Sequence, residues 1–365
     1  MKIVNFSDLI VDRTKDSVKL PTNEYKATGK TAIIDQGQNF IAGYTNNIDG
    51  IFTDIPAIIF GDHTRVFKYV DFPFFLGADG VKILKANQEV SYKYLFHYFL
   101  QAKFPNTGYA RHFKWLKDLK IPLPPLATQK HIAAVLDKCT ALIAKHKLML
   151  EKYDTLIKSR FIEMFGDPVQ NPMGWEIKKL SDVCTKINDG THNSPENYDT
   201  GDYKYITAKN IKESGFDFSN ITYVSKEVHD SIYSRCNPKM GDVLYIKDGV
   251  TTGIAMVNTL EEPFSLLSSV ALLKQNKNFI NGAFLAAQLN YPQKYKSIRE
   301  NMGGAAITRL TIQKINIIPV VVPPLSLQND FAGFVQQIDK SKCAVQKSLE
   351  KAETLYKALM QQYFG

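Results

Sequence analysis

The chain has 365 residues with 44% apolar and 22% charged side chains, a composition typical of folded globular proteins. This length favours two or more domains over a single core. The start, MKIVNFSDLIVD, has no apolar segment of a signal peptide, and no uncharged apolar run approaches the roughly 20 residues of a membrane helix. The four cysteines form no CxxC pair, so neither a disulfide framework nor a zinc site is indicated. We therefore expect a cytoplasmic protein that binds no metal and no membrane.

The net charge is +9, and it is unevenly distributed. Residues 1–166 carry 23 Lys and Arg against 16 Asp and Glu, a net of +7, and the remainder carries 22 against 20, a net of +2. A basic protein favours a polyanionic partner, of which nucleic acid is the commonest. Charge alone does not separate nucleic-acid binding from an ordinary basic surface.

A short repeated element opens each half of the chain. Residues 3–10 are IVNFSDLI and residues 177–184 are IKKLSDVC, so both place Ser-Asp between apolar positions. The halves span 1–166 and 175–365. DPVQNPMG (167–174) lies between them, and its two prolines and glycine indicate a linker.

The middle of each half has a mixed α/β pattern. Apolar runs bounded by Gly, Asn and Asp predict short strands, and one helix is expected in each half. The predicted strands are Ile55–Phe60, Val66–Val70, Val81–Leu84, Tyr203–Thr207, Val243–Ile246 and Val270–Leu273, and the predicted helices are Tyr92–Gln101 and Gly282–Asn290. Both middles follow the order strand, polar turn, strand and Pro-Phe, but their sequences otherwise diverge. A common scaffold with different loops is expected of two modules that recognise different targets.

A long helical pattern closes each half. IPLPPLATQKHIAAVLDKC (121–139) recurs 199 positions later as VVVPPLSLQNDFAGFVQQI (320–338), and the match continues without a gap to a final Phe-Gly. Apolar residues at 3-4 spacing predict a coiled-coil seam of about five heptads, and each di-proline marks a helix start. The expected packing residues are Ile132, Leu136, Ile143, Leu150, Ile157, Phe331, Val335, Ile338, Val345, Leu349 and Tyr356. His146 and Lys342 interrupt the seam, either to fix its register or, as we favour, at its edge.

These elements predict an α+β protein with two mixed α/β modules joined by two long antiparallel helices. The first helix delivers the chain to the second module, and antiparallel packing of the second helix returns the C-terminus to the first module. The result is a dumbbell with pseudo-twofold, circular organisation. The expected domains are a first module at 1–120, a helical spacer at 121–166, a second module at 167–319 that includes the linker, and a second spacer at 320–365.

The repeat and its diverged middles closely resemble the specificity subunit of type I restriction-modification systems. The resemblance covers essentially the whole chain. Its most specific elements are IPLPPLATQKHIAAVLD with its copy, FGDHTRVFKYVDFPFFLGADG in the first module, and NDGTHNSPENY with GDVLYIKDGVTTG in the second. The resemblance implies that each module is a target recognition domain for one half of an asymmetric bipartite DNA site. It also implies that the helices set the spacing of the half-sites.

The resemblance further implies a set of partners for this chain. They are double-stranded DNA, two methyltransferase subunits that use S-adenosylmethionine to methylate adenine, and restriction subunits that translocate and cleave DNA with ATP and Mg²⁺. Two similar helical regions fit two copies of one partner, since equivalent surfaces bind equivalent molecules.

The chain itself has no motif for catalysis. An adenine methyltransferase needs a Gly-rich cofactor loop and an Asn/Asp-Pro-Pro-aromatic strip, but the di-prolines here stand in Leu-Pro-Pro-Leu and Val-Pro-Pro-Leu. There is no GxxxxGK[ST] loop for ATP, and the seven histidines have no ligand spacing. We expect a non-catalytic subunit with no cofactor of its own.

Candidate DNA contacts in the first module lie on polar loops. Arg65, in the turn GDHTR, suits guanine or phosphate, and the alternative is a hairpin turn in which Asp62 caps its own backbone. Tyr44, in IAGYTNN, faces DNA or anchors a buried turn. Lys68, Lys82 and Arg111 suit phosphate contacts, and the alternative for a lone lysine is an ordinary solvated surface. The candidates of this module are Tyr44, His63, Thr64, Arg65, Lys68, Lys82 and Arg111.

Candidate contacts in the second module lie in NDGTHNS (188–194), ITAKN (206–210), KDGVTTG (247–253) and GGAAITR (303–309). Asn210 either recognises adenine or makes hydrogen bonds within a turn, and His192 either faces DNA or has a structural role. Gly303 and Gly304 are expected to be flexible beside Arg309. The candidates are Thr191, His192, Asn193, Lys209, Asn210, Lys247, Thr251 and Arg309.

Three alternatives remain open. One is an orphan or phage-borne specificity subunit, or one of another restriction class, which genomic neighbours distinguish. A second is a coiled-coil scaffold that joins proteins and ignores DNA. The third is an enzyme, which methylation of DNA by the isolated chain with S-adenosylmethionine would reveal.

The spacer interpretation has a direct test. Inserting four residues, about one helical turn, within 127–165 is expected to change the gap between the half-sites without changing their sequences, because the helix sets a distance and contacts no base. Mapping methylated adenines in cells that express the variant with its methyltransferase measures both. A change in the half-site sequences themselves would contradict the spacer role.

Overall fold

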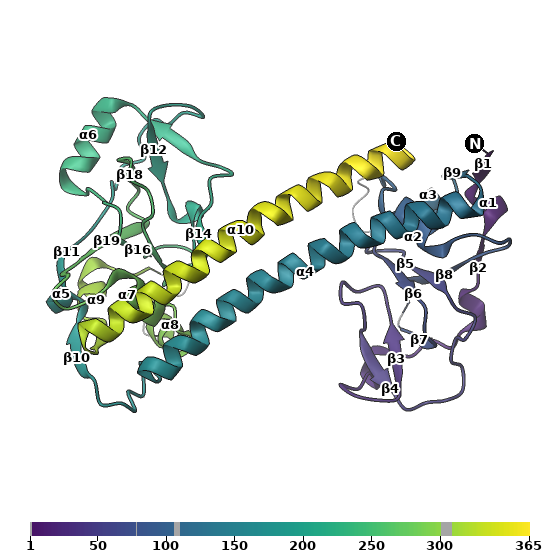
Figure 1. Ribbon diagram of the computed structural model, residues 1–365, viewed down its shortest axis with the longest axis horizontal. Coiled ribbons are helices and arrows are strands. Elements are labelled where there is room, and N and C mark those ends of the chain that lie inside the picture. Colours follow the sequence, from purple (N-terminus) through teal and green to yellow (C-terminus); the bar gives the residue numbers. More distant parts are fainter. Residues whose placement is uncertain (1, 78, 106–109, 301–308) are drawn as a thin grey trace. The chain divides into compact units, whose positions relative to one another are not determined.

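The computed structural model describes residues 2–77, 79–105, 110–300 and 309–365, and the chain has the predicted α+β fold (Figure 1). It divides into two compact units. Unit 1 contains residues 1–147 and 347–365, and unit 2 contains residues 148–346. Each unit therefore holds one α/β module together with part of both long helices.

The first module, in unit 1, is built on two small sheets. The four-stranded sheet has the order β2-β8-β5-β6, with β2 (Ile10–Asp12), β8 (Val81–Ala86), β5 (Ala57–Gly61) and β6 (Phe67–Val70) all antiparallel to their neighbours. The three-stranded sheet has the order β4-β3-β7, with β4 (Gly43–Thr45), β3 (Thr31–Ile34) and β7 (Phe74–Leu76). The helices are α1 (Phe6–Leu9), α2 (Tyr92–Leu100) and α3 (Phe113–Leu116).

The second module, in unit 2, repeats this plan. Its four-stranded sheet has the order β11-β19-β16-β17, with β11 (Cys184–Asp189), β19 (Val270–Gln275), β16 (Val243–Ile246) and β17 (Ala255–Val257). Its three-stranded sheet contains β15 (Thr222–Val224), β12 (Tyr203–Ile206) and β18 (Ser265–Leu266), and β13 (Ile211–Lys212) pairs with β14 (Gly215–Phe216). The helices are α5 (Leu180–Val183), α6 (Lys226–Arg235), α7 (Gly282–Leu289), α8 (Pro292–Glu300) and α9 (Ile312–Asn316).

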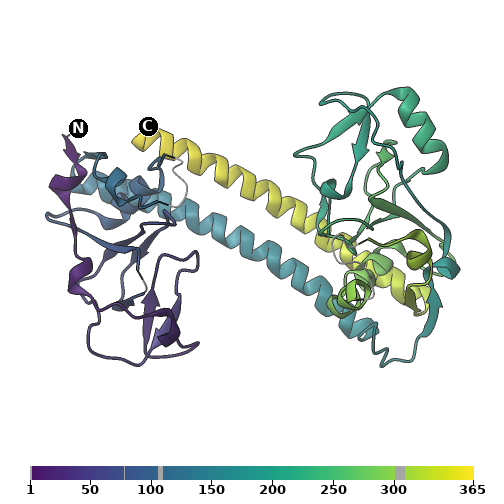
Figure 2. The same ribbon diagram turned by 180° about the vertical axis from the view of Figure 1, so that it is seen from behind.

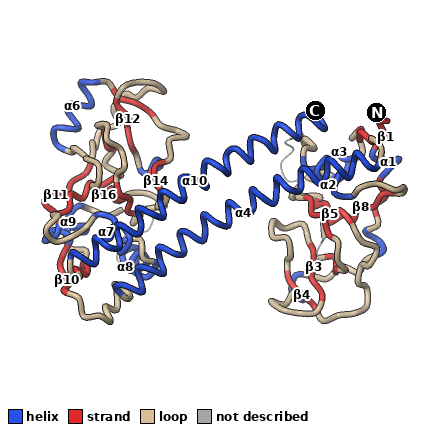
Figure 3. Tube along the Cα trace, viewed as in Figure 1, coloured by secondary structure: helices blue, strands red, loops and turns tan. Residues whose placement is uncertain are grey.

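The predicted strands and helices of the module middles are present, with ends that differ by at most two residues. The elements that the sequence did not predict include the three strands of the β4-β3-β7 sheet and helices α6, α8 and α9, so the expectation of one helix in each half was wrong. Those strands are only three or four residues long, which is too short for an alternating pattern to stand out. Loops make up much of both modules, as Figure 3 shows.

A two-stranded ribbon connects each module to its long helix. In unit 1, β1 (Lys2–Asn5) pairs antiparallel with β9 (Lys120–Leu123), which leads into α4 (Leu126–Phe165). In unit 2, β10 (Glu176–Lys179) pairs with β20 (Pro319–Val322), which leads into α10 (Leu325–Phe364). The repeated opening element and the repeated closing element of each half are therefore hydrogen-bonded neighbours.

The two long helices pack antiparallel within each unit (Figures 1 and 2). In unit 1, Leu136 near the start of α4 shares a core with Met360 near the end of α10. In unit 2 the order is reversed, because Phe161 near the end of α4 packs on Phe331 near the start of α10, with ring centroids 5.6 Å apart. The C-terminal part of α10 thus belongs to the core of unit 1.

The same aromatic contact anchors a helix end in both units. Phe364 of α10 lies 5.3 Å from the ring of Tyr94, and Phe165 of α4 lies 4.6 Å from the ring of Phe284. Tyr94 and Phe284 each stand three residues after the N-cap of their helix, α2 or α7. Each module therefore uses the same position to hold the end of a long helix.

The repeated glutamine explains why both copies have the same spacing between the di-proline and this residue. The amide oxygen of Gln129 accepts the backbone N–H of Ser91, the N-cap of α2, at 3.0 Å, and its amide nitrogen donates to the carbonyl of Pro124 at 2.8 Å. Gln328 does the same with the N-cap Asn281 at 2.9 Å and with Pro323 at 2.8 Å. Both glutamines are buried. Each therefore ties a module helix to the first turn of a long helix.

The predicted seam residues are all buried or half-buried. Among them Leu136 and Phe331 are fully enclosed. Lys342 is mostly covered and its ammonium lies 2.6 Å from Asp154 of α4, so this polar residue makes an ion pair between the helices. His146 is half-buried on α4.

The glutamine contact leads to a prediction about stability. Gln328→Ala is expected to lower the free energy of unfolding by about 2–4 kcal/mol, because it leaves the half-buried Asn281 N–H and the buried Pro323 carbonyl without partners. Urea unfolding of the full chain measures this. Gln336→Ala, at an exposed position of the same helix, is the control and is expected to change stability by less than about 0.5 kcal/mol. Equal effects of the two variants would contradict the role of Gln328.

Candidate nucleic-acid interface

Three of the polar loops singled out in the sequence lie at one edge of a four-stranded sheet: GDHTR in the first module, and NDGTHNS and KDGVTTG in the second. β2 and β5 are both antiparallel to β8, so they run parallel and their carboxyl ends lie at the same edge. In the second module, β11 and β16 have the same relation to β19. Residues 62–66 follow β5, and residues 190–193 and 247–253 follow β11 and β16.

Asp62 ties the GDHTR turn to a distant segment. Its carbonyl accepts the backbone N–H of His112 at 2.8 Å, its carboxylate accepts the N–H of Phe113 at 2.6 Å, and its own N–H donates to Gly80 at 2.6 Å. The carboxylate therefore caps residues of another segment, which differs from the hairpin alternative in which Asp62 caps its own turn. These contacts bring Arg111, next to His112, to the same edge as the turn.

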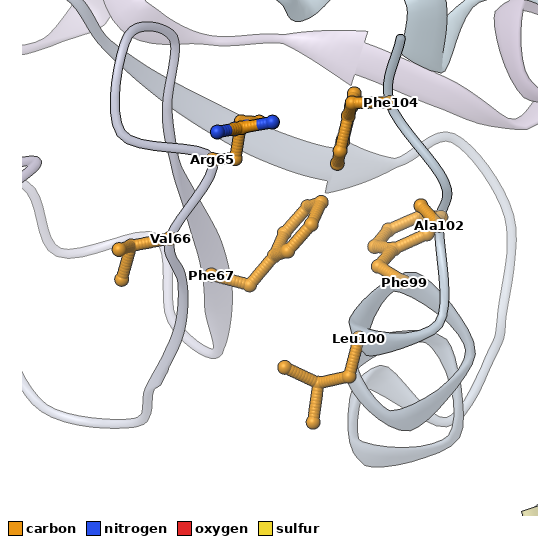
Figure 4. A pocket seen from close by; sticks show the side chains of 7 residues that line it. All are labelled: Arg65, Val66, Phe67, Phe99, Leu100, Ala102 and Phe104. Carbon is orange, nitrogen blue, oxygen red and sulfur yellow. The ribbon is translucent and has the colours of Figure 1, made fainter. Parts of the chain in front are cut away.

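Arg65 is exposed at the tip of this turn, in the left-handed conformation with φ of 62°. Thr64 supports the turn by donating its hydroxyl to the carbonyl of Gln36 at 2.6 Å. Arg65 lines a cavity of about 430 Å³ together with Phe67 and Phe104 (Figure 4). His63, half-buried, directly precedes Thr64, and its backbone N–H donates to the side-chain oxygen of Gln36 at 3.3 Å.

The two predicted lysines of the first module differ in position. Lys82 is half-buried, lies 2.7 Å from the Asp12 carboxylate and sits over the ring of Phe113. Burial acts to raise the pKa of Asp12, but hydrogen bonds from Lys82 and Thr14 outweigh it and lower that pKa. Lys68, by contrast, is buried, which lowers its pKa, and its ammonium donates to the carbonyls of Asp35 and Asn39. The phosphate contact suggested for Lys68 does not suit this position.

Tyr44 and Arg111 complete the first module's candidates. Tyr44 is half-buried on β4, in the three-stranded sheet, and its backbone exchanges two 2.9 Å hydrogen bonds with Lys26. It is therefore not on the loop edge of the four-stranded sheet. Arg111 is exposed, and its charge helps to lower the pKa of Asp79, after the larger effect of the hydrogen bond from Lys19.

In the second module, five charged residues form an alternating chain along the edge. The buried ammonium of Lys247 lies 3.3 Å from Asp189 and 3.4 Å from Asp248. Asp248 in turn lies 3.1 Å from Nε of Arg309. At the other end, Asp189 lies 3.8 Å from Nη1 of Arg235. Lys247 thus balances the two aspartates inside the module, and an exposed arginine stands at each end.

The remaining candidates of the second module surround this chain. His192 is exposed and lies 3.1 Å from Asp189, and Asn193 is exposed beside it. Thr191 and Thr251 are half-buried, and Lys209 is exposed. Asn210 is buried and caps a turn, since its side chain accepts the N–H of Thr207 and donates to Asp217. Asn210 thus has the turn role that was the alternative to adenine recognition. The predicted flexible residues Gly303 and Gly304 lie outside the described residues.

The two edges share a backbone arrangement but not their side chains. The N–H of Leu310 donates to the carbonyl of Lys247 at 2.8 Å, as the N–H of His112 does to Asp62. This register makes Arg309 the equivalent of Arg111. It also places Lys247 at the position equivalent to Asp62, so the second module has a buried cation where the first module has an anion.

Sequence reasoning missed Asp189, Arg235 and Asp248. Arg235 ends α6 and is 45 residues from Gly190, whose carbonyl its Nη2 contacts, and no sequence pattern announces this proximity. The two aspartates lie in NDGTHNS and KDGVTTG, where sequence analysis considered other residues as DNA contacts. Gln36, which organises the first module's turn, follows β3, a strand that the sequence did not predict.

Two further features bear on the class of site. Within the described ranges, no group of three or more His, Cys, Asp or Glu residues is arranged to hold a metal ion. None of the helices in the described part of the chain is long and apolar enough to cross a membrane. The two polar, arginine-bearing edges on a repeated scaffold define a two-module recognition protein.

Comparison with known proteins identifies the family. The model for the type I restriction modification DNA specificity domain matches residues 7–152 and 172–353. The EcoR124I/EcoR124II specificity subunit of Escherichia coli is 24% identical over 287 residues, which cover 73% of this chain and 69% of that protein. The MjaIX specificity subunit of Methanocaldococcus jannaschii is 22% identical over 267 residues, which cover 67% of this chain and 60% of that protein.

Solved structures share the fold. The type I restriction-modification S subunit of M. genitalium matches with a TM-score of 0.68 at 16% identity, covering 100% of this chain and 96% of that chain. A chain from a structural study of type I restriction-modification complex assembly matches with a TM-score of 0.52 at 17% identity, over 100% and 97% of the two chains. The chain belongs to the type I restriction-modification DNA specificity family, and it is a non-catalytic DNA-recognition subunit.

Arg65 provides a test of the first module's edge. Arg65→Ala is expected to weaken or relax recognition of one half-site only, by about 1–3 kcal/mol, because it removes a contact made by one module. Methylation mapping of the assembled complex measures each half-site separately. Lys30→Ala, which removes an exposed charge beside the three-stranded sheet, is the control. Equal loss at both half-sites would contradict a base contact by Arg65.

Proposed function

We propose that this chain directs a type I restriction-modification complex to an asymmetric bipartite site in double-stranded DNA. The first recognition domain (1–120) binds one half-site and the second (167–319) binds the other. The two helical spacers (121–166 and 320–365) fix the gap between them and dock two methyltransferase subunits. The chain guides adenine methylation and restriction without performing either reaction.

The observation that carries this proposal is the pair of equivalent loop edges with different side chains. One backbone arrangement appears in both modules, with His112 bonded to Asp62 in one and Leu310 bonded to Lys247 in the other. A shared backbone with different donors and acceptors suits the recognition of two different base sequences, because bases are distinguished by hydrogen-bond patterns at their edges. It explains why the two half-sites would differ.

The long helices support the spacer role. Each is 40 residues long, and each is anchored to one module by a buried glutamine and to the other by a terminal phenylalanine. A continuous helix is a stiff element, so it suits a fixed separation of half-sites better than a flexible linker does.

The partners supply the chemistry in this proposal. The methyltransferase subunits use S-adenosylmethionine, and restriction subunits use ATP and Mg²⁺ to translocate and cleave DNA. The complex acts in the cytoplasm of a prokaryotic cell, where it defends against foreign DNA. The similarity to named specificity subunits of type I restriction enzymes supports this assignment.

Two other functions make different predictions. An orphan or phage-borne subunit, or one of another restriction class, would bind DNA through the same edges without these particular partners. A coiled-coil scaffold would join proteins without binding DNA. The exposed arginines at both edges favour DNA binding over the scaffold.

The deciding experiment is co-expression of the chain with its cognate methyltransferase, followed by genome-wide mapping of methylated adenines. We expect one bipartite sequence with a fixed gap. Methylation without a sequence preference, or none beyond that of the methyltransferase alone, would refute the proposal.

Salt dependence separates DNA recognition from a protein scaffold. The logarithm of the affinity of the assembled complex for its site is expected to fall linearly with the logarithm of salt concentration, because binding to phosphates releases counterions. Fluorescence anisotropy with labelled duplex between about 50 and 200 mM salt measures the slope. A scaffold that ignores DNA predicts no binding above that of the methyltransferase alone.

A further inference from the structure

We propose that Val250 contacts the C5-methyl group of a thymine in the half-site of the second module. Val250 lies in the loop 247–253, which follows β16 at the loop edge of that module. This inference rests on the proposed function, since it assigns one base contact within that recognition.

The loop 247–253 exposes its apolar residue and covers its polar ones. Its sequence is KDGVTTG, so Val250 is the one large apolar side chain in it. Val250 is 89% exposed, the highest value among the large hydrophobic residues in the described part of the chain. The other six residues of the loop are buried or half-buried, and Lys247 and Thr252 are almost completely enclosed. Folding alone favours the reverse arrangement, with apolar side chains covered and polar ones at the surface.

Backbone and side-chain hydrogen bonds hold the loop in this conformation. At its base, the N–H of Ile246 donates to the carbonyl of Ile254, and the N–H of Gly253 donates to the carbonyl of Ile246, both at 2.8 Å. Within the loop, the hydroxyl of Thr252 donates to the carbonyl of Gly249 at 2.7 Å. None of these bonds uses the Val250 side chain, so the side chain is not needed to form the loop.

Arg299 of α8 fixes the backbone at Val250 itself. Its Nη1 donates to the carbonyls of Val250 and Thr252, each at 2.9 Å, and lies 3.1 Å from the hydroxyl of Tyr295. The guanidinium also lies over the ring of Tyr295, 5.4 Å from its centroid. The backbone that carries the valine is therefore anchored to a helix of the same module. A held backbone loses less conformational entropy on binding than a mobile loop does.

A valine side chain can distinguish only one base in the major groove. It has no donor or acceptor, so it cannot use the hydrogen-bond patterns that separate the four base pairs. Thymine alone presents an apolar group there, its C5-methyl. Contact between this methyl group and Val250 removes apolar surface of both molecules from water.

The corresponding turn of the first module presents different groups on the same base. The N–H of Gly61 donates to the carbonyl of Val66, and the N–H of Arg65 donates to the carbonyl of Gly61, both at 2.8 Å. The exposed residues of that turn are Thr64 and Arg65, both of which carry hydrogen-bond donors. Two turns closed by the same backbone bonds thus offer polar groups in one module and an apolar group in the other.

The test uses the assembled complex and duplexes of its mapped target in which each thymine in turn is replaced by deoxyuridine, which lacks only the methyl group. We expect wild type to bind one substituted duplex about fourfold more weakly, the ratio that burial of one methyl-sized group supplies. Val250→Ser is expected to bind both duplexes equally, at about the wild-type affinity for the uracil duplex. Val250→Ile, which keeps an apolar side chain, is expected to retain the difference.

Met240 provides a matched control. It is an exposed apolar residue that precedes β16, at the opposite edge of the same sheet from Val250. Met240→Ser is therefore expected to retain the fourfold difference between thymine and uracil. Thermal melting of each variant complex checks that the chain remains folded.

Several outcomes would overturn the inference. A wild type that binds every deoxyuridine duplex as well as the thymine duplex makes no methyl contact, and a difference that Val250→Ser retains comes from another residue. Equal weakening of both duplexes by Val250→Ser would indicate a wedge between base steps, and weaker assembly with the methyltransferase on size-exclusion chromatography would indicate a protein contact. If the wild-type complex has no sequence preference, the proposed function fails, whereas a specific wild type without a methyl effect refutes this inference alone.

Discussion

The contact on which the rest of the structure depends is a buried glutamine amide. Gln129 and Gln328 each hold the N-cap of a module helix with one atom and the carbonyl of a proline with another. A single planar group thereby fixes both the start of a long helix and its attachment to a module. Because the amide is buried, any other orientation would leave polar groups without partners, at a cost of about 1–3 kcal/mol each. The direction in which each long helix leaves its module follows from this constraint.

The modules separate what must be constant from what must vary. The sheet, the connecting ribbon and the helix contacts recur in both units with nearly the same hydrogen bonds. The loop edges carry different charges at equivalent positions, with Lys247 in place of Asp62. Backbone hydrogen bonds hold the loops, so side chains at their tips are free to change without loss of the fold. This division is what a protein needs in order to acquire a new DNA target while it keeps its partners.

The sequence predicted the elements with strong patterns and missed contacts between distant segments. The long helices and the strands Val243–Ile246 and Val270–Leu273 followed from periodicity and from the repeat, and the family was suggested by a resemblance in specific motifs. The turns around Arg65 and Lys247 were located correctly in the chain, but burial of Lys68 and Lys247 was not foreseen, because a lysine gives no local sign that carbonyls or carboxylates will surround it. Arg235 and Asp189 are distant in the sequence and come close together only in the folded chain.

The contact between Phe364 and Tyr94 has a consequence for the order in which the protein is made. The first module is synthesised before the second, yet part of its core comes from residues 356–364, which are synthesised only after the second module. The apolar surface that receives this helix end must stay uncovered while more than 200 further residues are added. The second module faces no such delay, since Phe161 and Phe165 precede it in the chain. The earlier module is thus the later one to be completed, because its aromatic surface is covered only when the end of α10 has been synthesised.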